Sequence, residues 1–305
     1  MKFKHCLLIV LAIAANSALA DGVDGCSRAL EAGDAGKAVV QAREAVRAAP
    51  NKRDAYLCLG RAAGELNQHE EALTALQAAE KLSTQPVERI VALTLIGNQY
   101  REAKNTSQAI VYYRNSLEIA RAEKNPGFEL INLNQIGSAL EESGDAAGAL
   151  EQYQLGLKLA ANDNERADSH GRIAAANSLL GQHDKAIEHQ LKAMLFEERA
   201  GDFNHYAHAN IELGRVCLVA QRYADAEKWL GKFLGTITEA GDSYWQAKAR
   251  YMLARVKSAK GAGNEAKEQF TLARNMASKL GAEQLLKEII AAESVPSTTQ
   301  QGGPP

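Results

Sequence analysis

The sequence predicts an all-α protein built from antiparallel helix pairs that repeat along the chain. Its composition is rich in Ala, Leu, Glu, Lys, Gln and Arg, which lose little side-chain freedom in a helix, and the 305 residues include only 6 prolines. No period-two alternation bounded by turn residues predicts strands. A segment with the pattern of two helices and a short turn, GNQYREAKNTSQAIVYYRNSLEIA at residues 97–120, is matched by GSALEESGDAAGALEQYQLGLKLA at residues 137–160.

Residues 1–20 form a separate segment. A basic start, MKFKH, precedes the apolar run CLLIVLAIAA, and residues 18–20 read ALA, a small-x-small cleavage pattern. The segment resembles a secretory signal peptide, and its apolar run is short for a membrane span; an uncleaved anchor is the alternative. We therefore expect a periplasmic or secreted protein that begins at Asp21 and has no stable membrane insertion after cleavage.

The repeat continues in both directions from the two quoted segments. Alanines expected on the second helix of each pair are Ala38, Ala72, Ala109, Ala149, Ala186, Ala226 and Ala266. Twelve residues before each alanine stand Cys26, Gly60, Gly97, Gly137, Ala174, Gly214 and Ala254. The alanines are spaced 34, 37, 40, 37, 40 and 40 residues apart, as in an array of helix pairs.

Steric reasons explain these residue types. Packed helices lie about 8–10 Å apart, and small residues at the crossing let them approach closely. We expect each first-helix Gly or Ala to face the alanine of the second helix. Helices this short are marginal alone, so each pair must pack against its neighbours.

These positions resemble the tetratricopeptide repeat (TPR) family. The matching residues are Gly33, Asp34, Ala38, Ala45 and Pro50 in the first unit, Leu59, Gly60 and Ala72 in the second, Ile96, Gly97, Tyr100, Ala109 and Tyr113 in the third, and Ile136, Gly137, Ala149 and Tyr153 in the fourth. The resemblance implies a right-handed superhelical solenoid of about seven units over residues 21–280. The fifth unit, with Ala174, Asn177 and Gln190, is the least regular and the expected place for a local bend.

Two segments follow the seventh unit. Residues 281–293, GAEQLLKEIIAAE, have the pattern of an amphipathic helix that caps the last exposed flank. Residues 294–305 lack apolar periodicity and are predicted to be a disordered tail.

No pattern in the sequence indicates catalysis, a cofactor or a metal. Phosphate-binding glycine loops, nucleophile elbows and metalloprotease helices are missing. His183, His189, His205 and His208 have no clustered Cys or carboxylate at ligand spacing, so we expect no metal site. A formal net charge of −2 argues against nucleic-acid binding.

The TPR resemblance bears on the cysteines, because adjacent first helices pack side by side in that family. Cys26 and Cys58 would lie on such helices, where an oxidising compartment permits a disulfide. Two buried free thiols are the alternative. Cys217 has the position of a buried core thiol rather than a nucleophile.

The resemblance also implies a concave groove lined by the first helices. The residues expected to face it and bind a protein or peptide partner are Arg61, Asn98, Arg101, Asn134, Arg172, His208, Arg215, Lys248, Tyr251 and Arg255. The C-terminal half of this set is basic, although Asp54 and Glu141 lie on the same face. The family's two-carboxylate clamp is not matched.

The sequence thus predicts a non-catalytic exported scaffold that binds proteins or peptides, with envelope assembly as one setting. The alternative is a sensor that binds a small peptide or signalling ligand inside the superhelix. The oligomeric state stays open.

Overall fold

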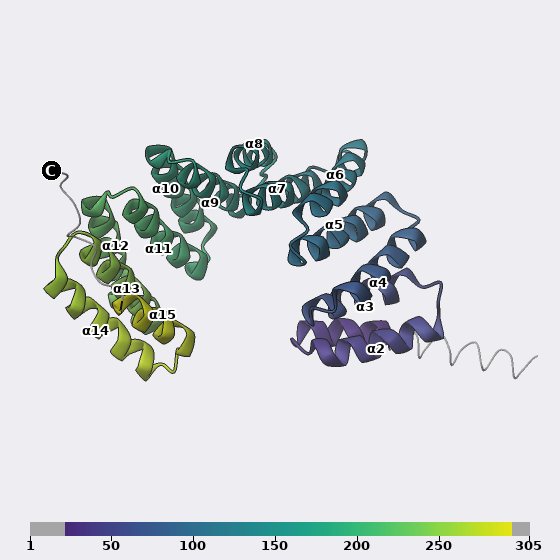
Figure 1. Cartoon of the computed structure of the whole chain (residues 1–305), viewed down its shortest axis with the longest axis horizontal. Helices are drawn as coiled ribbons and strands as arrows, with labels where there is room; N and C mark the ends of the chain where they lie inside the picture. Colours follow the sequence, from purple (N-terminus) through teal and green to yellow (C-terminus); the bar gives the residue numbers. More distant parts are fainter. Residues whose placement is uncertain (1–21, 295–305) are drawn as a thin grey trace, which may run out of the picture. The chain divides into compact units, whose positions relative to one another are not determined.

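The computed structural model describes residues 22–294, and every regular element in this range is a helix (Figure 1). A helix at residues 22–31 pairs with α2 (Ala35–Ala48). The further pairs are α3 (Arg53–Glu65) with α4 (His69–Leu82), α5 (Pro86–Glu102) with α6 (Thr106–Ala122), α7 (Pro126–Glu142) with α8 (Ala146–Leu157), α9 (Asp163–Leu179) with α10 (His183–Ala200), α11 (Phe203–Val219) with α12 (Tyr223–Glu239), and α13 (Ser243–Ala259) with α14 (Gly263–Lys279). The seven helix pairs predicted from the sequence are confirmed.

The chain divides into two compact units. The N-terminal unit ends at Leu159 and holds the first four pairs, whereas the C-terminal unit begins at Ala160 and holds the last three pairs and α15 (Glu283–Glu293). The division falls directly before the fifth pair, which the sequence marks as the least regular.

Short polar turns separate the helices. Side chains that cap the next helix by accepting a backbone N–H are those of Asp34, Asn105, Asn125, Asp145, Asn162, Asp202 and Asp242. Many turns also need a left-handed residue, which is glycine at Gly33 (φ 73°) and Gly144 (φ 90°). These local signals fix where each helix begins and ends.

In four of the pairs, the first-helix glycine makes room for a large side chain of the second helix. A Cβ added at Gly97 would lie 2.6 Å from Cδ1 of Tyr113, and one at Gly137 would lie 2.8 Å from Cδ1 of Tyr153. The sequence predicts that these glycines face the repeat alanines; at Gly60 the added Cβ would lie 3.3 Å from the Ala72 carbonyl oxygen, but the nearest atoms belong to the side chain four residues, about one helical turn, after the alanine. The alanines themselves are buried, as at Ala109.

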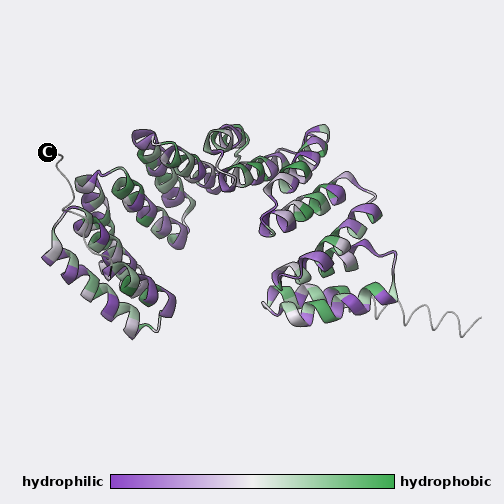
Figure 2. Ribbon diagram, in the orientation of Figure 1, coloured by the Kyte–Doolittle hydropathy of each residue, from purple (hydrophilic) through white to green (hydrophobic). Residues whose placement is uncertain are grey.

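The two kinds of helix pack differently within each unit. Consecutive first helices contact one another, α3 with α5 and α5 with α7 in one unit, α9 with α11 and α11 with α13 in the other. Consecutive second helices show no comparable contact in residues 22–294; each packs on first helices instead. First helices therefore pack on one another, whereas second helices are held apart by the first helices between them. Figure 2 shows hydrophobic and hydrophilic residues alternating along the helices.

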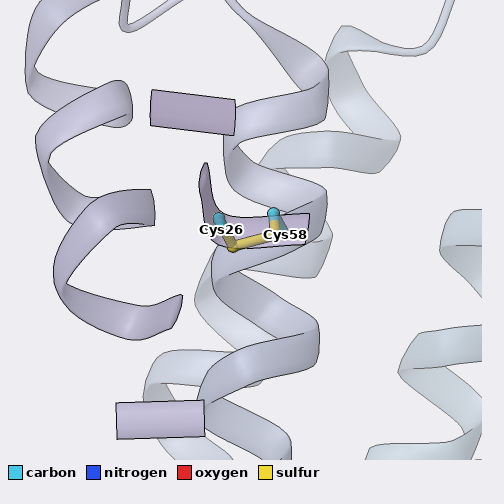
Figure 3. Close-up of a disulfide and its surroundings, with 2 residues drawn as sticks. All are labelled: Cys26 and Cys58. Atoms are coloured by element: carbon cyan, nitrogen blue, oxygen red, sulfur yellow. A yellow bond between two sulfur atoms is a disulfide. The ribbon is translucent and has the colours of Figure 1, made fainter. Parts of the chain in front are cut away.

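A disulfide joins the first two pairs. Cys26 and Cys58 are bonded, with 6.4 Å between their Cα atoms, a separation typical of disulfides (Figure 3). Both side chains lie in a cluster of small buried residues that includes Ala38 and Ala62. The bond therefore ties the helix at residues 22–31 to α3.

The end of the C-terminal unit is covered by α15. Its Leu285 and Ile289 are buried in a cluster with Phe270 and Ala273 of α14. Residues 22–294 include no helix with the length and apolar content to cross a membrane. The predicted signal peptide at residues 1–20 and the predicted tail from residue 295 onward lie outside the described residues.

Candidate partner-binding surface

In the C-terminal unit, the accessible side chains of the first helices recur in register. Asp168 and Arg172 lie on α9, His208 and Arg215 on α11, and Lys248, Tyr251 and Arg255 on α13. Each set is spaced at three, four or seven residues, so it falls along one side of its helix. Because α9 contacts α11 and α11 contacts α13, these side chains form one first-helix face.

In the N-terminal unit, most of the predicted groove residues bond within the protein. The Tyr113 hydroxyl donates to Asn98 Oδ1 at 2.7 Å, and Arg101 donates to Gln135 Oε1 at 2.6 Å. Asn134 is buried, with 9% of its surface exposed. Arg61 is exposed on α3. This part of the predicted groove therefore stabilises the fold and offers a partner little beyond Arg61.

Two of the four predicted cations of the C-terminal half are neutralised by their own helix. Arg172 Nε lies 2.8 Å from an Asp168 carboxylate oxygen, and Arg215 Nε lies 2.6 Å from a Glu212 carboxylate oxygen. These pairs are three or four residues apart, the spacing at which side chains meet on a helix. The basic character predicted for this half is therefore confined largely to α13.

A run of cations and rings follows one side of α13, and we call Tyr244, Lys248, Tyr251 and Arg255 the α13 stripe. Lys248 Nζ lies 5.4 Å from the Tyr244 ring centroid, and the Arg255 guanidinium lies 5.8 Å from that of Tyr251. Tyr244 is 40% exposed. No carboxylate pairs with Lys248 or Arg255 among the described residues. The stripe therefore keeps both charges available to an outside group.

Neighbouring residues hold the α13 stripe in place. Trp245 is 7% exposed and its indole N–H donates to Asn204 Oδ1 on α11 at 3.1 Å. Lys248 Nζ lies 5.3 Å from the Trp245 ring centroid, and the Tyr251 ring lies 6.4 Å from that of Phe270 on α14. Sequence reasoning missed Tyr244, although its spacing from Lys248, Tyr251 and Arg255 is that of one helix face.

The titratable groups with strongly shifted pKa values lie in the interior instead. Burial raises the pKa of the Cys217 thiol to about 11, so the thiol is protonated at neutral pH and unsuited to nucleophilic attack. Burial, with a smaller contribution from the charge of His189, lowers the pKa of His170 to about 4. The Nδ1 atoms of these two histidines are 2.9 Å apart, and the His170 ring stacks on Phe196.

The remaining histidines do not gather into a metal site. His205 lies on the surface, with Nδ1 3.9 Å from a Glu197 carboxylate oxygen, and His208 is exposed on the first-helix face. No group of three or more His, Cys, Asp or Glu side chains in residues 22–294 could hold a metal ion. The chemistry available on this surface is ion pairing, hydrogen bonding and contact with aromatic rings.

Solved structures of other proteins share this architecture. A Podosopora anserina chain described as kinesin light chain TPR-like repeats matches with a TM-score of 0.57 and 16% identity, over 65% of this chain and 99% of that chain. The apo form of RapI matches with a TM-score of 0.59 and 19% identity, over 78% and 94% of the two chains. The fold is a TPR-like helical solenoid.

A longer protein contains the same arrangement as one of its parts. The STAND ATPase PH0952 from Pyrococcus horikoshii, described with a tetratricopeptide repeat sensor, matches with a TM-score of 0.69 and 18% identity over 88% of this chain. This chain spans 44% of that protein's length. At these identities the likeness concerns the fold alone. No protein-family model matches the sequence, and no curated protein matches it.

Proposed function

We propose that this protein is an exported, non-catalytic TPR-like scaffold that binds a protein or peptide through the first-helix face of its C-terminal unit. The α13 stripe carries the proposal. It combines two cations that lack carboxylate partners in the described residues with two tyrosine rings on one side of a first helix.

This chemistry suits a peptide segment that carries a carboxylate next to an apolar or aromatic side chain. A cation held over a ring keeps its charge while losing side-chain freedom, so it loses less entropy when an acidic partner arrives. Arginine can accept a carboxylate in two parallel hydrogen bonds. The accessible first-helix face provides a surface along which an extended peptide segment can lie across α9, α11 and α13.

Export is supported by two independent observations. The first 20 residues have a basic start, an apolar run and a small-x-small end. The bond between Cys26 and Cys58 suits an oxidising compartment such as the periplasm or the extracellular space. Envelope assembly is a setting in which such a scaffold would work, and a net charge of −2 favours protein over nucleic-acid partners.

A peptide array tests the proposal directly. Peptides that contain Asp or Glu near an aromatic residue are presented beside copies in which Asn or Gln replaces the acid. We expect the mature protein to prefer the acidic copies, with binding that weakens as salt rises. The double variant Lys248→Glu/Arg255→Glu should lose this preference.

A matched variant controls for net charge. Lys267→Glu/Lys279→Glu makes the same charge change on exposed positions of the second helix α14 and should bind like the wild type. Circular dichroism checks that both variants stay folded. Equal binding of acidic and amide peptides, or equal loss in both double variants, contradicts the proposal.

A further inference from the structure

A recess lies in the C-terminal unit, between the second helices α10 and α12. This second-helix groove has a volume of about 320 Å³ and is lined mainly by apolar side chains from three helices. They are Leu191, Met194 and Leu195 of α10, Tyr206 of α11, and Trp229 and Phe233 of α12. None of its lining residues belongs to the α13 stripe.

The repeat architecture explains why the groove is open. α10 and α12 both pack on α11, but they do not contact each other as consecutive first helices do. A gap therefore runs between them with α11 as its floor. Leu195 stands at its edge with 51% of its surface exposed, although a large apolar side chain gains about 1.5–3 kcal/mol when fully buried.

The charges along the groove are unequal. Lys228 and Lys232 of α12 lie over the Trp229 ring, with Nζ 5.3 and 5.9 Å from its centroid. Neither lysine pairs with a carboxylate among the described residues, whereas Lys192 and Arg199 of α10 each do. The α12 rim of the groove is therefore positive and its charge is available.

A helix fits this groove better than an extended strand. The backbone N–H and C=O groups of α10, α11 and α12 are already bonded within their helices, so an extended peptide would find no backbone partners there. An amphipathic helix satisfies its own backbone and needs only an apolar face and a suitable rim. A helix seated on α10 and α12 would pack on each of them at the usual interaxial distance of about 8–10 Å.

We propose that the second-helix groove binds an amphipathic helix of a partner protein, with carboxylates on the side that meets Lys228 and Lys232. The apolar face of the partner helix covers Leu195 and Trp229. Its opposite flank can place a basic residue near Glu198, which is exposed on the α10 rim. This site is independent of the proposed function, because it shares no residue with the α13 stripe.

Tryptophan fluorescence can report on this groove selectively. The chain has 2 tryptophans, Trp229 in the groove and Trp245 on α13, so Trp245→Phe leaves Trp229 as the only reporter. The probe is a synthetic tryptophan-free amphipathic helix with Leu and Phe on one face and Glu along one flank. We expect a saturable shift of Trp229 emission to shorter wavelength.

Two variants and two peptides define the specificity. Leu195→Arg and Lys228→Glu/Lys232→Glu should each weaken binding at least about tenfold, the size of effect expected at a central contact. A peptide of the same composition with scrambled order should not bind, and one with Lys in place of Glu should bind more weakly. Val111→Arg, an equally exposed apolar position on α6 (47%), should bind like the wild type.

Several results would overturn this inference. They are no saturable shift with the Glu-flanked helix, equal binding of the scrambled peptide, or equal affinity of the Leu195→Arg and wild-type proteins. Light scattering measured during the titration separates peptide binding from pairing of two copies of the chain. A shift that follows the protein concentration alone would assign the groove to self-association and contradict a helical partner.

Discussion

The two units repeat the same helix pair with different side-chain chemistry. In the N-terminal unit, the residue four positions after the repeat alanine is a tyrosine in two pairs. Its hydroxyl donates to the first helix, from Tyr113 to Asn98 at 2.7 Å and from Tyr153 to Ser138 at 3.3 Å. In the C-terminal unit, the corresponding residue is Gln190, Leu230 or Phe270. None of these side chains carries a hydroxyl that could donate a hydrogen bond to the first helix.

That difference decides what each surface offers a partner. Where tyrosine fills the pair, the first-helix residue after the small Gly is Asn98 or Ser138, and it bonds internally. Where Leu230 or Phe270 fills it, the equivalent residue is Arg215 or Arg255. A polar side chain that bonds within its helix pair is not available to a partner, which is the case for Asn98 and Ser138.

The largest expected effect that distinguishes the units is loss of the disulfide. Cys26→Ser/Cys58→Ser removes a cross-link between residues 32 apart, which constrains the unfolded chain and contributes about 3–4 kcal/mol. Hydrogen exchange followed by peptide mass analysis should show lost protection in α2, α3 and α4 and unchanged protection in α11 to α14. Uniform loss along the chain would show that the units unfold as one.

Free-thiol counting supplies the control for that prediction. Alkylation of the unfolded, unreduced protein should modify only Cys217 of the three cysteines in residues 22–294. Three modified thiols would show that Cys26 and Cys58 are unbridged in solution.

Overpacking the Gly–Tyr contact should have the next largest effect. Gly137→Leu places side-chain atoms where the buried Tyr153 ring now lies, and overpacking of this kind costs about 1–3 kcal/mol. Thermal unfolding followed by circular dichroism measures the loss. Gly171→Ala in α9 is the matched control, because its added Cβ meets nothing within 4 Å and alanine favours a helix by about 0.5–1 kcal/mol. Equal melting curves for Gly137→Leu and wild type would contradict the close crossing.

Acid should weaken the C-terminal unit. The pKa of His170 is about 4 in the folded protein, below its usual value near 6.5. Between pH 6.5 and 4 the histidine is therefore protonated in the unfolded chain and neutral in the folded protein. Stability therefore falls as the pH drops from about 6.5 to 4, by about 3 kcal/mol, and then levels off. Both tryptophans lie in this unit, so their fluorescence during urea unfolding measures the loss there.

A histidine variant tests the cause of that pH dependence. The groups that act on His170 are His189, Lys192 and Glu188, all of α10, and the pair is held by the 2.9 Å contact between its Nδ1 atoms. His170→Asn should reduce the fall between pH 6.5 and 4, and the lowered pKa of the partly buried His189 accounts for a remainder. An unchanged slope would assign the fall to other groups.

The smallest effect concerns the tyrosine hydrogen bonds. Tyr113→Phe removes the donor to Asn98, and a net hydrogen bond contributes about 0.5–1.5 kcal/mol. Phe270→Leu is a comparison in the C-terminal unit, where only apolar packing changes. A Tyr113→Phe protein as stable as the wild type would show that the ring, rather than its hydroxyl bond to Asn98, closes the pair.

Much of the fold follows from local sequence signals. Asp34, Asn105 and Asp242 stand where caps are needed, and small residues recur twelve positions before each alanine. The large second-helix side chain that packs on each first-helix glycine was not predictable from spacing. Its identity depends on the rotation of the second helix and on the size of the side chain one turn beyond the repeat alanine.

The candidate surface was predicted only in part. Lys248, Tyr251 and Arg255 lie accessible on α13, whereas Asn134 is buried and Asn98 bonds to Tyr113. The pairing of Arg172 with Asp168 was readable from their spacing on one helix. Burial of Asn134 was not, because it depends on how α7 packs in the folded stack.

Site-specific photo-crosslinking tests the central claim most directly. A photoreactive phenylalanine replaces Tyr244 of the α13 stripe in the full chain, expressed with its own first 20 residues, and replaces Leu272 of α14 in a control of similar exposure. The account predicts a defined adduct from position 244 that disappears in the Lys248→Glu/Arg255→Glu background, and none of the same mass from position 272. An adduct of equal yield at both positions, or one that survives the charge reversal, would contradict partner binding by the first-helix face.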